Sequence, residues 1–298
     1  YNAKYHFPKT GKIETIIGMQ GMHQTNKNLF FFLLFLSMVA WGASWVNVKI
    51  ICHYIDVYEM IFMRYFISAV AMVPIIIMLK QSFKIDFKSF LLVLLSSLVL
   101  IAYMNFYYLG TKYGTASLGG AMVTTLIPIN TFIILALMRT KKVTRKDTFA
   151  LGLGAVGVLT MLNVWSLDSK EIFLIQNLYF FLGSILWAVL TIISSKSTKI
   201  SPIVFTFYMY VVMIVLVWTF AIDSSIIISH EYDSKFWINM LCMSLLSTTF
   251  ANTIYFLGIE KLGAREVSSF TFLVPFAAIV LSAIFLDEKI SIAMVAGR

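Results

Sequence analysis

The chain has 298 residues, of which 60% are hydrophobic and 12% are charged, and its formal net charge is +9. Soluble domains carry about 25% charged residues. The sequence therefore has too few charges to cover a water-facing surface, which excludes a soluble globular protein and predicts a polytopic protein of the lipid bilayer.

Apolar stretches of about 20 residues recur along the chain, and each is long enough to cross about 30 Å of hydrocarbon as a helix. Residues 1–28 precede them as a polar segment without a signal-peptide apolar region, which we interpret as a leader or an added sequence. Nine predicted spans lie near 29–50, 57–79, 90–110, 115–138, 149–165, 175–195, 201–222, 236–257 and 264–286. Residues 289–298 begin another apolar run, so we predict an all-α membrane protein with ten transmembrane helices, the tenth truncated.

The distribution of Lys and Arg orients these spans. With the N-terminus in the cytoplasm, the inner segments hold sixteen Lys and Arg and the outer segments six, whereas five acidic residues lie inside and nine outside. This asymmetry follows the positive-inside rule. It predicts a multi-pass protein of the cytoplasmic (inner) membrane, and the basic run 139–147 is interpreted as a short inner loop rather than a nucleic-acid site.

Polar and aromatic side chains inside the spans predict a binding cavity. Amides and phenols in hydrocarbon need partners, so they tend to face a cavity or another helix. Interfacial aromatic belts and amides that tie helices together are the alternative. In chain order, the candidates are Trp41, Ser44, Trp45, Asn47, Tyr103, Asn105, Tyr107, Trp187, Asn252 and Tyr255.

Arg64 is the charge that the sequence places within the bilayer, about seven residues into the second span. An intramembrane ion usually faces the bundle or water, so Arg64 is a candidate to contact a substrate carboxylate. It could equally pair with Glu59 or Asp56, or extend to the membrane surface. Lys49, near the outer end of the first span, is more typical of a lysine that extends to the surface.

Gly152, Gly154 and Gly157 have the spacing of a dinucleotide-binding fingerprint. They lie inside an apolar span with no preceding strand, so we interpret them as helix-packing contacts and predict no cofactor. The small-residue run 114–121 is interpreted either as a hinge or as a close-packing face.

The two halves of the chain resemble each other. Residues 108–144 align with residues 256–291, which places Pro128 opposite Pro275. A proline within a helix permits a kink, so the pair predicts hinge or gating positions, with a fixed kink as the alternative.

The first span also has a counterpart, because Trp41 in "VAWGASW" aligns with Trp187 in "ILWAVLT". The offset is about 147 residues, or five spans, and an odd number of spans forces the halves into opposite orientations. The sequence therefore predicts two inverted five-helix repeats, residues 29–165 and 175–298, an arrangement found in many transporters.

These features resemble the EamA-like family of the drug/metabolite transporter superfamily, from about residue 29 to residue 298. The resemblance rests on the 5+5 plan, the opening helix "AWGASWVNVKI", Arg64, the fourth and ninth helices with their prolines, and "LDEKIS" at 286–291. Lys141-Lys142 departs from the acidic turn that the family usually has in the first repeat. The resemblance implies alternating access through a central cavity lined by spans 1, 3, 4, 6, 8 and 9.

Other chemistry is sparse in the sequence. Cys52 and Cys242 form no metal or disulfide motif, and the four histidines lack ligand spacing. His53, Asp56 and Glu59 are interpreted as a solvated outer turn. We therefore predict neither a metal site nor catalytic residues.

The function that the resemblance implies is that of a secondary transporter, expected to export small metabolites such as amino acids or amines. The expected partners are the small-molecule substrate, the lipid bilayer and a coupling proton or cation, in a monomer or a homodimer. The alternatives are a membrane-integral enzyme acting on small or lipid substrates, which needs clustered His, Asp or Cys, and a non-transporting membrane subunit.

Overall fold

The structure is a computed structural model that describes residues 24–138, 174–197, 199–222, 232–262 and 270–288, together with residues 144, 149, 152–153, 156–157, 159–160 and 267. The regular elements in these parts of the chain are all helical. They are α1 (Gln24–Ile51), α2 (Val57–Met78), α3 (Phe87–Tyr113), α4 (Ala116–Leu137), α7 (Ile175–Ser194), α8 (Pro202–Phe220), α10 (Ser234–Leu241), η2 (Cys242–Phe250), α11 (Ala251–Leu262), η3 (Thr271–Leu273) and α13 (Val274–Leu286).

Eight of the predicted spans lie in the described parts of the chain. Seven of them are long and apolar enough to cross a membrane, the seventh being the continuous stretch Ser234–Leu262, whereas Thr271–Leu286 is shorter. The predicted tenth helix lies outside the described residues, and so does most of the predicted fifth span, 149–165. The all-helical membrane fold is confirmed for the described residues, and the count of ten helices stays a prediction.

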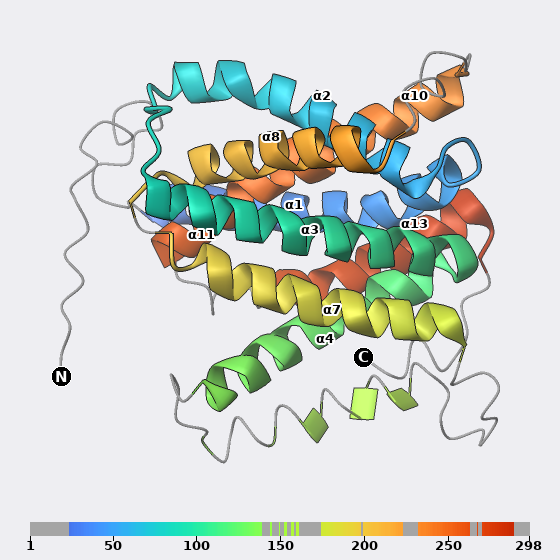
Figure 1. Ribbon diagram of the computed structural model, residues 1–298. Coiled ribbons are helices and arrows are strands. Elements are labelled where there is room, and N and C mark those ends of the chain that lie inside the picture. Colours follow the sequence, from blue (N-terminus) through green and yellow to red (C-terminus); the bar gives the residue numbers. More distant parts are fainter. Residues whose placement is uncertain are drawn as a thin grey trace.

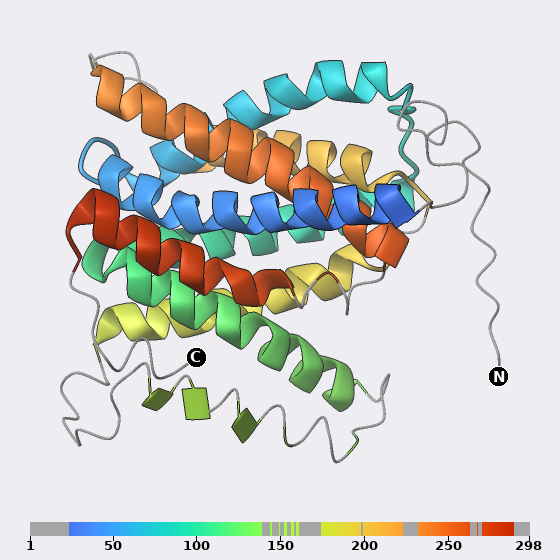
Figure 2. The ribbon, with the colours of Figure 1, turned by 180° about the vertical axis from the view of Figure 1, so that it is seen from behind.

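Helix α1 runs along the middle of the bundle in the two opposite views, with α2 and α8 on one side of it and α4 and α7 on the other (Figures 1 and 2). It packs against α13, η2, α11, α4, α3 and α10, while α3 and α4 are joined on their other side by α7. Helix α2 packs on α8 and η2. Side chains that α1 turns toward its neighbours are therefore deep inside the molecule.

Small residues allow this close packing. A Cβ atom added at Gly42 would lie 2.5 Å from the Ala277 Cβ and 2.8 Å from the Ala278 backbone nitrogen. One added at Gly119 would lie 2.5 Å from the Trp45 ring. Membrane helices associate through such contacts, so the run 114–121 is a close-packing face.

The packing interpretation is wrong at Gly152. This residue is exposed, and a Cβ atom added there would meet nothing within 4 Å. Gly154 lies outside the described residues. The glycine that resembled a fingerprint residue thus packs on no described helix, because an apolar sequence does not reveal which helix face meets protein and which meets lipid.

Charged side chains hold the junction between α3 and α4. The Lys49 ammonium donates hydrogen bonds to the carbonyl oxygens of Thr111 (3.0 Å), Lys112 (3.1 Å) and Gly114 (2.6 Å) at the end of α3. The Lys49 ammonium is therefore bound to a helix end, a partner that the sequence did not reveal. A cation at a helix C-terminus is stabilised by the helix dipole and by the unpaired carbonyls there.

Glu288 provides the opposite charge at the start of α4. Its carboxylate accepts hydrogen bonds from the backbone N–H groups of Ala116 (2.8 Å) and Ser117 (3.0 Å), and from the Ser117 hydroxyl (2.6 Å). We call Lys49, Glu288 and residues 111–117 the junction lock. It ties α1, α3, α4 and the end of α13 together at the predicted outer end.

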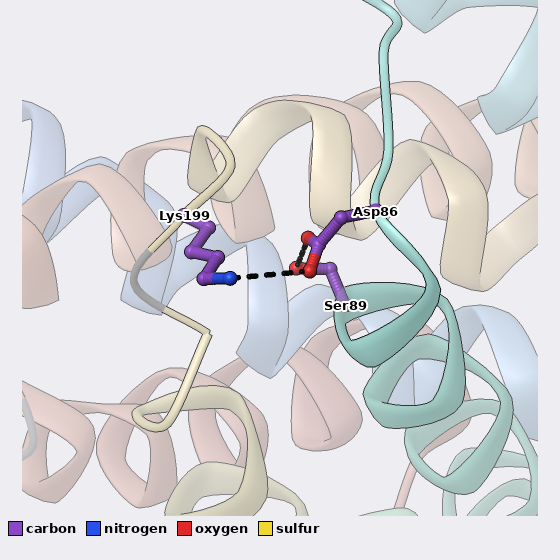
Figure 3. Close-up of polar contacts among 3 residues, drawn as sticks. All are labelled: Asp86, Ser89 and Lys199. Carbon is purple, nitrogen blue, oxygen red and sulfur yellow. Dashed lines mark hydrogen bonds and ion pairs between the residues drawn. The ribbon is translucent and has the colours of Figure 1, made fainter.

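The other end of the bundle carries the one ion pair found among the described residues, Lys199 with Asp86, at 3.4 Å (Figure 3). Asp86 also accepts a hydrogen bond from the Ser89 hydroxyl at 2.5 Å, and this bond, followed by Lys199, lowers the pKa of the Asp86 carboxyl. The pair joins the linker before α3 to the linker between α7 and α8. Both side chains are exposed, so the pair contributes little stability on its own.

The two matched prolines differ in their surroundings. Pro128 lies within α4, as predicted. Pro275 lies in the first turn of α13, directly after the 3₁₀ turn η3, so the expectation of a mid-helix position is wrong for it. In a first turn the missing N–H of proline costs nothing, since that N–H would have no partner in the helix.

Candidate functional site

A small cavity lies at the centre of the bundle, with a volume of about 40 Å³. It brings together side chains from most of the helices around α1. They are Trp41, Ser44, Trp45, Arg64, Tyr103, Met104, Tyr107, Thr124, Ile127, Trp187, Asn252, Thr271 and Val274. Eight of the eleven residues that the sequence proposed for substrate binding are in this set.

Aromatic rings form one wall of the cavity. The Trp41 and Trp187 rings meet edge to face with their centroids 5.6 Å apart, so the two tryptophans that align between the halves are in contact. Tyr255 packs on Trp41 at 4.8 Å, and Tyr103 packs on Trp187 at 4.8 Å. Tyr255 therefore supports the cavity wall from behind Trp41.

Hydrogen bonds fix the Trp41 ring. Its indole N–H donates to the Asn252 side-chain oxygen at 3.0 Å and to the Ser247 carbonyl at 3.1 Å. The Asn252 amide nitrogen in turn donates to the Tyr210 hydroxyl at 2.6 Å. This chain links α1 to α8 through the junction of η2 and α11.

A second wall is formed by Trp45, Tyr107 and Ser44. The rings of Trp45 and Tyr107 have their centroids 4.2 Å apart. The Tyr107 hydroxyl donates to the Ser44 hydroxyl oxygen at 3.1 Å. The Ser44 oxygen thus already accepts one hydrogen bond.

Arg64 is buried, with 4% of its surface exposed. Its Nε donates to the Thr248 hydroxyl at 2.6 Å, and its Nη1 donates to the Tyr108 hydroxyl at 3.0 Å. Among the described residues, no carboxylate lies within ion-pair distance of the guanidinium. Glu59 accepts from the Asp56 backbone N–H at the start of α2 instead. The alternatives in which Arg64 pairs with these acids or extends to the surface are therefore wrong.

The π-helix η2 places Thr248 beside Arg64. Within it, the hydroxyls of Thr248 and Thr249 donate to the carbonyls of Met243 and Ser244, each five residues back. Because the Thr248 proton is used in this way, its oxygen is free to accept from Arg64. Short π-helical segments are often found at functional sites.

Several donors at the cavity lack acceptors. The Trp187 indole N–H at the cavity and the Tyr255 hydroxyl behind Trp41 are buried without a hydrogen-bond partner in the described structure. The described bonds of Arg64 use two of the five N–H groups of a guanidinium. The site is therefore rich in unused hydrogen-bond donors.

Besides Tyr255, which stands behind Trp41, two predicted candidates do not line this cavity. Asn47 faces a separate apolar groove between α1, α10, η2 and α13. Asn105 donates to the Tyr58 hydroxyl at 2.8 Å, on an exposed part of α3. The prediction that both residues line the cavity is wrong, because helix periodicity alone did not fix the rotation of either helix.

Met104 and four residues near the matched prolines also line the cavity and were not predicted from the sequence. Thr124 and Thr271 each lie four residues before a matched proline, and Ile127 and Val274 lie directly before one. The offset of 147 residues between the halves relates both pairs. That alignment was the signal that could have identified them.

His53, Asp56 and Glu59 do not assemble a site. Asp56 and Glu59 form the capping box of α2. The described residues contain no group of three or more His, Cys, Asp or Glu side chains that could hold a metal ion. The two carboxylates therefore serve the start of α2.

Comparison with known proteins gives consistent results. The sequence model of the EamA-like transporter family matches residues 28–163 and 174–297. A protein of Archaeoglobus fulgidus named an uncharacterized transporter is 23% identical over 263 residues, which cover 86% of this chain and 89% of that protein. The uncharacterized transporter YyaM of Bacillus subtilis is 22% identical over 182 residues, 59% of either chain.

A solved crystal structure shares the fold, with a TM-score of 0.64 over 91% of this chain and 92% of the other, at 12% identity. At that identity the likeness concerns the fold alone. The family match, by contrast, covers most of the sequence and both halves of it. The chain belongs to the EamA-like transporter family.

Proposed function

We propose that the protein is a secondary transporter that carries small amphipathic metabolites, such as amino acids, across the cytoplasmic membrane by alternating access. The central cavity is the proposed binding site, and export is the proposed direction. Family membership supports transport as such. The observation that carries the proposal is the gathering of aromatic rings and polar groups from seven elements around one buried cavity.

The chemistry of the wall suits small amphipathic solutes. Aromatic faces bind apolar bodies and cations, and the rings of Trp41, Trp45, Tyr103 and Trp187 provide such faces. Hydroxyl and amide groups can hold a polar head without the cost of an additional buried ion. A phosphorylated solute would call for several basic residues, and the cavity contains only Arg64.

The cavity in this structure is too small to hold a metabolite. A volume of about 40 Å³ admits a few water molecules, since one water needs roughly 10–15 Å³. A metabolite can therefore enter only when the surrounding helices separate. The junction lock and the Lys199–Asp86 pair hold the two ends of the bundle, and we propose that they release in alternation.

A gradient of protons or cations is the proposed driving force. The sequence contains no Walker A phosphate-binding loop. In the predicted inverted repeats, each half can adopt the conformation of the other. The cavity can then open alternately to the two sides of the membrane.

The test is solute counterflow in proteoliposomes with a panel of labelled amino acids, organic acids and amines. Trp41→Ala is expected to lower uptake by about tenfold or more, which corresponds to about 1.4 kcal/mol of binding free energy. Trp237→Ala is the matched control, since Trp237 is 41% exposed on α10 and does not line the cavity. Failure of every solute to exchange, or equal uptake by both variants and the parent, would overturn the proposal.

A further inference from the structure

We infer that Arg64 binds the carboxylate of the transported solute, so that the substrates are amino acids and other small carboxylates, and simple amines are not carried. This inference rests on the proposed function and narrows it. It is drawn from the burial of Arg64, from its uncharged partners, and from the kind of hydrogen-bonding group that the cavity leaves unused.

The first observation is an uncompensated charge. Burying an ion is costly unless it is paired and hydrogen-bonded. Arg64 is 4% exposed, and its described hydrogen bonds go to two neutral hydroxyls, those of Thr248 and Tyr108. No described carboxylate balances it. An anionic solute in the adjoining cavity would supply the missing charge.

The second observation is the imbalance between donors and acceptors. The oxygens of Asn252 and Ser44 each already accept one hydrogen bond, from Trp41 and Tyr107 respectively, which leaves one lone pair on each. The Trp187 indole N–H remains without a described partner, as do three of the guanidinium N–H groups. A carboxylate offers two oxygens that only accept, whereas an amine brings donors and a like charge.

The third observation is that the guanidinium is held in place before any ligand arrives. Thr248 on η2 and Tyr108 on α3 bind different nitrogens of it, which restrains the plane of the group. A guanidinium binds a carboxylate through parallel N–H bonds, so its orientation matters. Thr248 is therefore a positioning residue that acts through Arg64.

The aromatic wall completes the fit. Trp41 and Trp187 line the same cavity as Arg64 and present ring faces to whatever the carboxylate carries. An apolar side chain can pack on such faces, and an α-ammonium group can make a cation–π contact with them. Both zwitterionic amino acids and monocarboxylates satisfy the site.

The experiment uses matched probes that differ in one group. They are L-leucine with L-leucinamide, and 3-phenylpropionate with phenethylamine, all measured at pH 7 in proteoliposomes. The parent protein is expected to take up the carboxylate of each pair at least tenfold faster than its partner. Arg64→Gln is expected to lower carboxylate uptake at least tenfold and to bring the ratio within each pair close to one.

Two further variants keep the result independent of folding. Arg64→Lys retains a charge without the planar fork, and is expected to keep part of the preference for carboxylates. Thr248→Val retains Arg64 and the volume of the side chain, and is expected to raise the KM for leucine several-fold with less effect on the maximal rate. Lys196→Gln, an exposed lysine after α7, is the control that should leave the ratio unchanged.

Quenching of tryptophan fluorescence by the same probes in detergent separates the two proposals. Binding of carboxylates without uptake contradicts transport but supports the Arg64 site. Equal uptake of amides and acids, or unchanged carboxylate uptake by Arg64→Gln, overturns the Arg64 site while transport stands. Neither binding nor uptake of any probe overturns both.

Discussion

Three charged side chains in this bundle are held by neutral groups instead of opposite charges. Lys49 binds backbone carbonyls, Glu288 binds backbone N–H groups, and Arg64 binds hydroxyls. The first two are satisfied by helix termini, which carry partial charges of opposite sign. The described hydrogen bonds of the Arg64 guanidinium involve no helix terminus, and we propose that a ligand completes them.

The Asn252 side chain connects two helices of the site, α1 and α8. It accepts from Trp41 and donates to Tyr210. We expect Asn252→Leu to lower the stability of the protein by about 1–3 kcal/mol, because Tyr210 then loses a buried partner and Trp41 keeps only the Ser247 carbonyl.

Thermal unfolding in detergent, followed by intrinsic fluorescence, measures that change. Asn239→Leu is the matched control, since Asn239 is on α10 and its described hydrogen bond goes to the carbonyl of Lys235 in the same helix. Equal unfolding temperatures for the two variants would contradict the role given to Asn252.

Among the elements, the ends of α1, α2, α3 and α4 were predictable to within a few residues from hydropathy. The π-helix η2 was not, because α- and π-helices have the same apolar composition and differ only in hydrogen-bond register. Likewise, the 3₁₀ turn before Pro275 has no distinct apolar pattern. These irregular turns supply Thr248 and Thr271, and sequence reasoning missed both.

Replacing a glycine by alanine is expected to change the stability of the protein in opposite directions at two positions. Gly42→Ala is expected to destabilise the protein, because the new Cβ would meet Ala277 and the Ala278 backbone, which cannot rotate away. Gly152→Ala is expected to stabilise it by about 0.5–1 kcal/mol, since alanine favours a helix and nothing lies within 4 Å of the site. Unfolding temperatures compare them, and shifts in the same direction would refute this account of α1 packing.

For the whole molecule, the sequence was sufficient for the all-helical membrane fold and for the family. Eight residues that line the cavity were also candidates from the sequence, because tryptophan, tyrosine and arginine are conspicuous within apolar spans. It could not exclude Asn47 and Asn105, since the side of a helix that faces a cavity depends on packing with distant helices. The inverted orientation of the halves remains a prediction.

Topology can be tested with single cysteines in a background in which Cys52 and Cys242 are serine. Asp287→Cys and Lys142→Cys are expected to react with a membrane-impermeant maleimide from opposite sides of the membrane, with position 287 labelled in intact cells. Asp287 is exposed, and replacing it leaves the neighbouring Glu288 carboxylate in place. Labelling of both positions from one side would refute the predicted orientation.

The junction lock makes the opening of the predicted outer face dependent on external salt. Opening it separates Lys49 from the end of α3 and Glu288 from the start of α4, so that two charges lose their partners together. Dissolved ions screen such charges, with a Debye length of about 10 Å at 0.1 M. External ionic strength should therefore ease opening on that side, whereas internal ionic strength acts on Lys199 and Asp86. Salt on one side of the membrane would then govern one half of the transport cycle.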